Sequence, residues 1–133
     1  MLFRSSFTIE DGMRLTATDA GLTGPVASIS SPSIITLPDG RYRMYFSDLP
    51  RPGDPPGGHW VKSAVSADML TWQMEEGIRV GAGSPAVAET AEHPFALPNA
   101  DGSVTLFYGK FAIGLAGPEG LYQSTAEIGR AHV

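Results

Sequence analysis

The sequence of 133 residues predicts an all-β fold. Sixteen glycines and eleven prolines indicate many turns and few long helices. Asp-Gly pairs stand between short apolar runs, a pattern typical of antiparallel hairpins. No segment shows the apolar period of a convincing helix. We therefore expect short antiparallel strands in one small domain.

The same succession of strand and turn occurs twice. The first copy, SPSIITLPDGRYRMYFS, covers residues 31–47, and the second, EHPFALPNADGSVTLFYGK, covers residues 92–110. Pro32 and Pro94 are 62 residues apart (94 − 32), and the Asp-Gly pairs that follow them have the same spacing. A unit of about four short strands that restarts in this way is typical of propeller blades. The two copies are predicted to be the inner hairpins of successive blades.

Each strand is predicted from an apolar run and the turn signals around it. The first repeat is expected to form strands over residues 33–37, 41–47, 60–66 and 72–80, and the second over residues 95–97, 104–110 and 120–126. Residues 48–59 are too rich in Pro and Gly for a regular ladder and are expected to be a long loop, as are residues 81–91. Residues 7–15 carry another Asp-Gly pair and are expected to form a small hairpin or sheet edge.

The predicted elements divide the chain into four parts. Residues 1–30 are an N-terminal strand or hairpin segment, residues 31–80 a complete blade, and residues 81–126 a second, incomplete blade. The last seven residues, EIGRAHV (127–133), match the translation of a common sequencing adapter, so we exclude them from functional reasoning. The rest is then expected to be a piece of a longer protein. A blade buries both faces only against neighbours, so its expected partners are the remaining blades of the full-length chain.

Composition excludes several classes of function. A net charge of −5 without a basic stripe argues against a nucleic-acid partner. The chain has no cysteine, which excludes disulfides and thiolate chemistry and fits a reducing compartment. No stretch has the length and apolarity of a signal peptide or a membrane span, so we expect a cytoplasmic protein without a membrane partner. We expect neither a cofactor nor a metal.

A further motif narrows the type of blade. Residues 66–72, SADMLTW, follow the pattern S-x-D-x-x-x-W. The sialidase Asp-box is a poorer match, because it has Gly after the Asp and its Trp one place later. With LPDGRYRMYFS and VKSAVSADMLTW, the pattern resembles the five-bladed propellers of the arabinanase, invertase and levansucrase superfamily, over residues 31 to about 126. The resemblance implies a carbohydrate ligand, glycosidase-like hydrolysis and a whole protein of roughly 300 residues.

The resemblance also implies where the catalytic groups would lie. A glycosidase needs two carboxyl groups, and by resemblance the base would be the Asp of an Asp-Pro pair in the first blade, with a second Asp-Pro pair tuning the acid. Ser31 and His93 occupy these positions here, and neither is a carboxylate. Glu92 would point to the other side of an extended strand unless a bulge re-aims it. The acid is expected from a third blade, and we name Glu92 and His93 as candidate catalytic residues.

Strand direction predicts which end of the blades meets the ligand. The first strand of each repeat begins at one end and the Asp-Gly turn lies at the other, so the loop 48–59 returns to the starting end. The side chains expected at this end are Ser31, Ser33, Asp48, Arg51, Asp54, His59, Trp60, Glu89, Glu92, His93 and Lys110. The candidate substrate-binding residues among them are Asp48, His59, Trp60 and Lys110. Trp60 suits either a platform for a sugar ring or packing between blades.

The opposite end is expected to be architectural. Asp68 is predicted to accept hydrogen bonds from turn N–H groups, and Trp72 to pack near the junction of the two blades. The candidate partners of Arg41 and Arg43 are Asp39, Glu75 or a ligand.

Three functions remain open from the sequence. The first is a carbohydrate-active enzyme that hydrolyses a glycosidic bond. The second is a propeller that binds glycan or protein without hydrolysis, consistent with the absence of an Asp at Ser31. The third is a relative of the mannoside phosphorylases, for which a cationic phosphate site is conceivable at Arg51, His59, His93 and Lys110.

Overall fold

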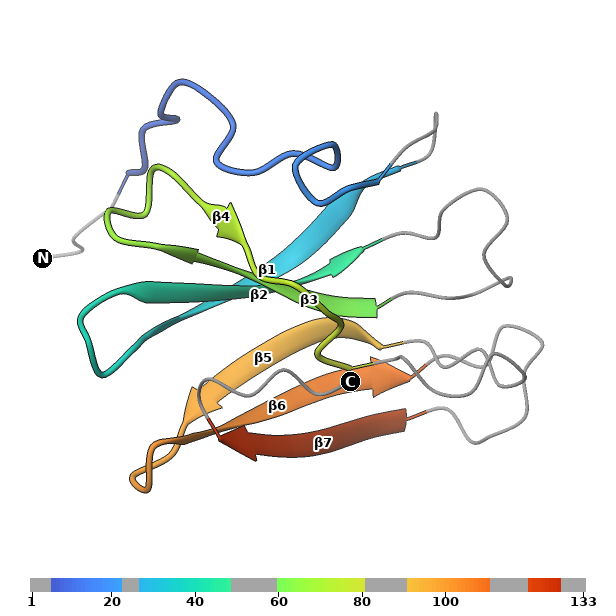
Figure 1. The fold of residues 1–133 in the computed structure, drawn as a ribbon. Coiled ribbons are helices and arrows are strands. Elements are labelled where there is room, and N and C mark those ends of the chain that lie inside the picture. Colours follow the sequence, from blue (N-terminus) through green and yellow to red (C-terminus); the bar gives the residue numbers. More distant parts are fainter. Residues whose placement is uncertain (1–5, 23–26, 49–59, 81–90, 111–119, 128–133) are drawn as a thin grey trace, which may run out of the picture.

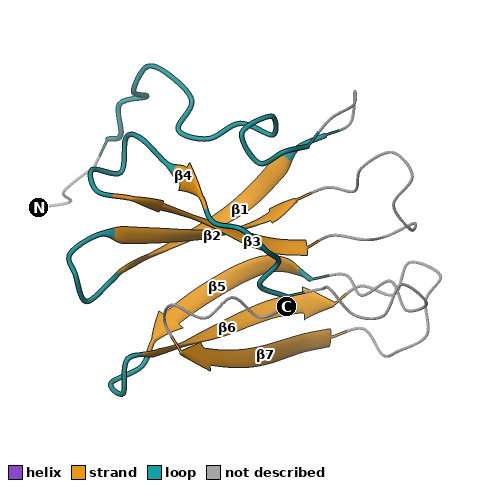
Figure 2. Cartoon of the chain, in the orientation of Figure 1, coloured by secondary structure: helices purple, strands orange, loops and turns teal. Residues whose placement is uncertain are grey.

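The computed structural model describes residues 6–22, 27–48, 60–80, 91–110 and 120–127. They form two antiparallel sheets, and no helix occurs among them (Figures 1 and 2). The first sheet contains β1 (Ile29–Thr36), β2 (Tyr42–Asp48), β3 (Trp60–Ser66) and β4 (Gln73–Met74), in that order. The second contains β5 (Glu92–Pro98), β6 (Ser103–Lys110) and β7 (Gly120–Glu127), also in order. The described part therefore has no helix that is long and apolar enough to cross a membrane.

The Asp-Gly pairs form the two inner hairpin turns, as predicted. Gly40 and Gly102 have φ values of 86° and 85°, in the left-handed region that glycine adopts without steric cost. The two turns share one pattern of backbone hydrogen bonds, with the glycine N–H donating to the carbonyl of Leu37 or Asn99. Equivalent turns at the two positions confirm the repeat at the level of the backbone.

Strand register confirms the two ends of the first blade. Asp48 pairs with both Ile29 and Trp60, so the start of β1, the end of β2 and the start of β3 lie together. Ser66 pairs with Tyr42 at the opposite end. The S-x-D-x-x-x-W segment therefore lies away from the end at which β2 ends and β3 begins. The loop predicted over residues 48–59 lies, apart from Asp48, outside the described residues.

The two sheets pack face to face, with β5 against β1 and β2 (Figure 1). Side chains of β2 alternate between two apolar clusters. Tyr45 joins the cluster between the sheets, whereas Met44 and Phe46 join a second cluster on the other face of the first sheet. The first cluster contains Ile35, Leu37, Tyr45, Val61, Ala91, Ala96, Val104, Leu106 and Tyr108. This is the arrangement predicted for successive propeller blades.

Two strand predictions are wrong. Residues 6–22 form loops and turns without a strand, although Gly12 does adopt a φ of 86°. Phe7 and Ile9 were expected in that hairpin, but each is 97% exposed and packs against neither sheet. The strand predicted over residues 72–80 is reduced to Gln73–Met74, because Gly77 adopts a φ of 89°, and only a bridge from Val80 to Val61 follows.

Trp72 also lies elsewhere than predicted. It packs with Ala20, Leu22, Met44 and Phe46 in the second cluster, on the face of the first sheet that is turned away from the second sheet. Trp72 directly precedes β4, and Met74, the last residue of β4, is paired with Ala64 and packs against the same cluster. The N-terminal segment therefore covers Trp72, and the second blade does not.

Candidate functional site

The two sheets meet through a contact between equivalent positions of the repeat. Ser31 of β1 and His93 of β5 are 62 residues apart, and Ser31 Oγ lies 2.7 Å from His93 Nδ1. A bulge interrupts each strand at this point, between Ser30 and Ser33 in β1 and between Glu92 and Phe95 in β5. A bulge places an extra residue in one strand and re-aims its side chain. The repeated bulge is thus what brings Ser31 and His93 together.

The backbone at both bulges is strained. Ser31 has a φ of 55° and His93 a φ of 53°, in a region that residues with a Cβ rarely adopt. Neighbouring hydrogen bonds stabilise the conformation: the N–H of His93 donates to Ser47 Oγ over 3.0 Å, and the N–H of Ala96 donates to Ser33 Oγ over 2.9 Å. Strain of this kind gathers at functional sites, so the junction of β1 and β5 is our candidate functional site.

Glu92 belongs to the same group. Its Oε2 lies 3.6 Å from His93 Nε2, and its side chain is 14% exposed against 64% for His93. The bulge follows directly after Glu92 and changes the direction of side chains at this point, which a regular extended strand would not do. We call Ser31, Glu92 and His93 the junction cluster. It offers one carboxylate, one imidazole open to solvent and one hydroxyl.

Asp48 is at the predicted end but faces into the molecule. Its side chain is 2% exposed, and its Oδ2 forms an ion pair of 2.7 Å with Lys62 Nζ. Asp48 Oδ1 also accepts the N–H of Trp60 over 3.1 Å. The ion pair and the bond to Trp60 tie the carboxylate to the neighbouring strand and give Asp48 a structural role in the first blade.

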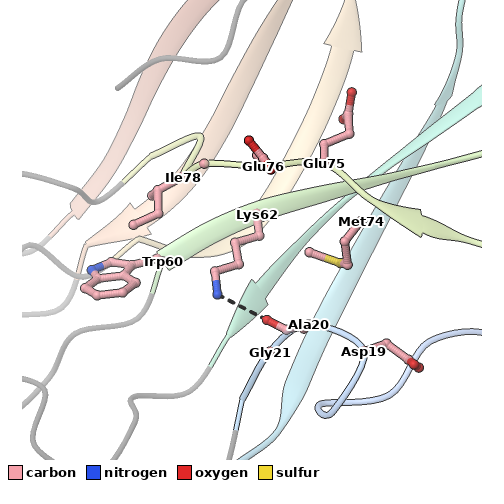
Figure 3. Close-up of a pocket in the computed structure, with 10 residues that line it drawn as sticks. Asp19, Ala20, Gly21, Trp60, Lys62, Met74, Glu75, Glu76 and Ile78 are labelled. Carbon is pink, nitrogen blue, oxygen red and sulfur yellow. Dashed lines mark hydrogen bonds between the residues drawn. The ribbon is translucent and has the colours of Figure 1, made fainter.

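Trp60 lines a cavity on the face of the first sheet that is turned away from the second (Figure 3). The cavity has a volume of about 410 Å³ and is bounded by β3, by residues 74–78 and by the turn at residues 19–21. Lys62 points across it toward the carbonyl of Ala20, 3.5 Å away (Figure 3). Sequence reasoning placed Trp60 with the junction cluster, but the alternation of β3 turns its side chain to the other face.

Arg41 and Arg43 have protein partners. Arg41 pairs with Asp39 on the surface, and Arg43 makes two hydrogen bonds to Glu75, of 2.8 and 2.7 Å. Ser63 also donates to Glu75, over 2.6 Å. Burial raises the pKa of Glu75, but the hydrogen bonds from Arg43 and Ser63 outweigh it and hold that pKa below its ordinary 4.5. The sequence left this pairing open, and the structure assigns it to the scaffold.

Asp68 is architectural, as predicted. Its Oδ1 accepts the N–H groups of Leu70 and Thr71, each over 2.8 Å, and the indole N–H of Trp72 donates to the carbonyl of Met69. The backbone N–H groups of Thr71 and Leu70 hold the pKa of Asp68 below its ordinary value.

The remaining site predictions fall partly outside the described residues. His59, Arg51, Asp54 and Glu89 lie there, and of Lys110 only the backbone is described, paired with Gly120. Two serines of the first sheet, Ser33 and Ser47, accept backbone N–H groups of β5. Sequence reasoning did not predict these contacts, although it placed Ser33 at the correct end. Within the described ranges no group of three His, Asp or Glu side chains is placed to hold a metal ion.

Comparison with solved structures shows the fold. The chain resembles the crystal structure of an endo-arabinase from Bacteroides thetaiotaomicron VPI-5482, with a TM-score of 0.62 and 18% sequence identity. The match covers 90% of this chain and 41% of the endo-arabinase chain, so the chain spans less than half of that protein. No family model matches the sequence, and no curated protein matches it. The chain thus folds as part of a β-propeller.

Proposed function

We propose that the protein containing this chain is a carbohydrate-active, five-bladed propeller whose ligand meets the junction cluster. The observation that carries the proposal is the contact between Ser31 and His93, at two bulges with strained backbone. Residues from successive blades converge there, as expected of a site on a propeller axis. The likeness to an endo-arabinase supports a carbohydrate as the ligand class.

The chemistry of the cluster supports two versions of this function. In hydrolysis, Glu92 serves as one of the two carboxyl groups that a glycosidase requires, His93 positions it or the substrate, and another blade supplies the acid. In binding without hydrolysis, the exposed imidazole and the Ser31 hydroxyl bond sugar hydroxyls and no bond is cleaved. The second version is favoured by one observation: Ser31 and His93, rather than two carboxylates, occupy the converging positions.

We also propose that a further sheet packs on the outer face of the second sheet. Phe95 and Phe107 are paired neighbours on that face, and they are 60% and 39% exposed. The repeat relates Phe107 to Tyr45, which the second sheet buries to 5% exposure. In the first sheet, Tyr45 is the side chain that packs against the next blade. The equivalent position of the second sheet, Phe107, also carries a large apolar side chain. A third blade that follows the second sheet as the second follows the first would cover Phe107.

The experiment uses the full-length protein and linear arabino-oligosaccharides as the probe. In the hydrolytic version, Glu92→Gln is expected to abolish or strongly reduce turnover and His93→Ala to lower it. In the binding version, His93→Ala is expected to lower affinity and no turnover is seen. Tm should stay nearly unchanged in both variants. Asp68→Ala is the matched control: it removes the turn bonds and should lower Tm while leaving activity intact.

Each result decides between the versions. If the protein binds oligosaccharide, loses binding on His93→Ala and shows no turnover, the binding version holds. If Asp68→Ala abolishes activity in a protein that melts normally, the assignment of the two ends is inverted and the proposal fails. Binding and turnover that are both untouched by Glu92→Gln and His93→Ala also refute it.

A further inference from the structure

We propose that residues 7–15 form an edge of the last blade's sheet in the full-length protein and thereby join the two ends of the propeller. The inference rests on the propeller of the proposed function and adds how its ring is closed. In a closed ring, each sheet has a neighbour on both faces. The second sheet covers one face of the first sheet, so the last blade must cover the far face, on which Met44 and Phe46 lie.

The N-terminal segment lies in the layer that the last blade would occupy. Residues 6–22 run along the first sheet on the side turned away from the second sheet (Figure 1). Leu22 packs there with Met44 and Phe46 and is only 2% exposed. The cavity of about 410 Å³ beside the turn at residues 19–21 shows that the segment covers this face only in part. A neighbouring sheet would therefore complete the cover and lie beside the N-terminal segment.

Residues 7–15 have the pattern of a hairpin without a sheet to join. Phe7, Ile9 and Met13 alternate with polar residues around an Asp-Gly pair, and Gly12 has a φ of 86°, as the glycines of the inner hairpin turns do. These three apolar side chains are 97%, 97% and 82% exposed. Among the described residues, no backbone hydrogen bond joins this stretch to either sheet. Alternating apolar side chains on backbone outside any ladder are the features of a strand that pairs with a further sheet.

The last blade suits this stretch better than a second copy of the chain does. The chain spans 41% of the endo-arabinase that it resembles, which leaves room for further blades in a protein of that length. Ala17 and Ala20 already pack on the far face, so a blade on that face would have a sheet edge next to residues 7–15. A second copy would have to displace that blade to reach the same residues.

The first test identifies the partner of the stretch in the full-length protein. The photo-crosslinker p-benzoylphenylalanine is placed at position 7, and the cross-linked peptides of a mixture of ¹⁴N and ¹⁵N protein are identified by mass spectrometry. We expect cross-links from position 7 to the last repeat of the same chain. The inference is overturned if the cross-links reach a second copy or if none reaches the last repeat.

Hydrogen exchange tests whether the stretch is a strand. In the full-length protein, the amides of residues 7–15 should exchange about a hundredfold or more slowly than those of an unstructured peptide. Phe7→Lys combined with Ile9→Lys should remove this protection and lower Tm by about 5 °C or more, through loss of apolar burial. Ser6→Lys combined with Thr8→Lys is the matched control, because it adds the same charge at exposed positions that alternate with the apolar ones. It should leave both the exchange and Tm nearly unchanged.

The inference and the proposed function fail in different ways. If residues 7–15 exchange as fast as an unstructured peptide, or if the two double variants lower Tm equally, the inference fails. The effects of Glu92→Gln and His93→Ala on binding and turnover then still decide the proposed function. If the stretch is protected and cross-links to the last repeat while those two variants change nothing, closure by residues 7–15 stands and the proposed function falls.

Discussion

Glu75 is the residue on which the buried charges of the first blade depend. Two arginines, Arg43 and Arg79, approach its carboxylate, and Arg43 is only 9% exposed. Glu75→Ala would leave Arg43 without a counter-charge inside the sheet packing. We expect it to lower the free energy of unfolding by about 2–4 kcal/mol, somewhat below the value for a fully buried pair because Glu75 is partly exposed. Chemical denaturation followed by circular dichroism measures this.

Acid should reproduce part of that effect. The pKa of Glu75 is lower in the folded chain than its ordinary 4.5, so its contribution is complete above pH 4.5 and is lost as the pH falls through the lowered value. Arg41→Met is the control, because its ion pair with Asp39 lies on the surface, half-exposed on both sides. If Arg41→Met lowered the free energy of unfolding as much as Glu75→Ala does, burial of the Arg43–Glu75 pair would add nothing to its effect on stability.

The inner hairpins depend on the conformation of one glycine in each turn. An added Cβ at Gly40 or Gly102 would meet no atom within 4 Å, yet both residues have a positive φ. Gly40→Ala and Gly102→Ala should therefore each cost about 1–2 kcal/mol through backbone strain alone. Gly120→Ala is the matched control: Gly120 begins a strand, its added Cβ would lie 3.9 Å from Tyr122, and the change should stay within about 0.5 kcal/mol. Thermal unfolding of the three variants compares them; a destabilised Gly120→Ala beside a neutral Gly40→Ala would contradict this account.

At the scale of the strand, bulges decide what the junction contains. In strands without bulges, the side chains at positions 31 and 93 would point to a face of the sheet set by simple alternation along the strand. The bulges break that alternation at equivalent points in both strands and bring Ser31 to His93. Sequence spacing predicted the equivalence of these two positions. It did not predict their contact, since a bulge has no clear signature in a run such as Ser-Ser-Pro-Ser.

The whole molecule exposes an apolar face on its second sheet. Phe95, Leu97, Phe107 and Leu121 are between 39% and 89% exposed. The 133-residue chain by itself is therefore expected to bind a hydrophobic dye or to aggregate, because nothing in the described chain covers this face. Leu97→Lys combined with Phe107→Lys should reduce dye binding by half or more without lowering Tm.

Phe7→Lys provides the control for that measurement. Phe7 is 97% exposed and lies in the N-terminal segment, apart from the apolar face, so its substitution should leave dye binding nearly unchanged. A soluble monomer that melts sharply and binds no dye would contradict the expectation.

Part of the candidate site was predictable and part was not. The sequence placed Asp48, Trp60, Glu92 and His93 at one end of the blades, and register confirms this end for Asp48 and Trp60. It could not show that Asp48 is closed off by Lys62, because that pair joins neighbouring strands diagonally on one face of the sheet. It also could not separate Trp60 from His93, which lie at the same end but are turned to different faces.

The sequence by itself determined the all-β class, the repeat of 62 residues, the positions of most strands and the inner hairpin turns. These follow from local physics: alternation of apolar residues, and glycines that tolerate a positive φ. Only the tertiary structure decided which face each side chain occupies, which carboxylates pair with Lys62, Arg43 and Arg79, and that Trp72 packs against the N-terminal segment. Those outcomes depend on bulges and on contacts between residues far apart in the chain, whose free energies exist only once the two sheets have packed together.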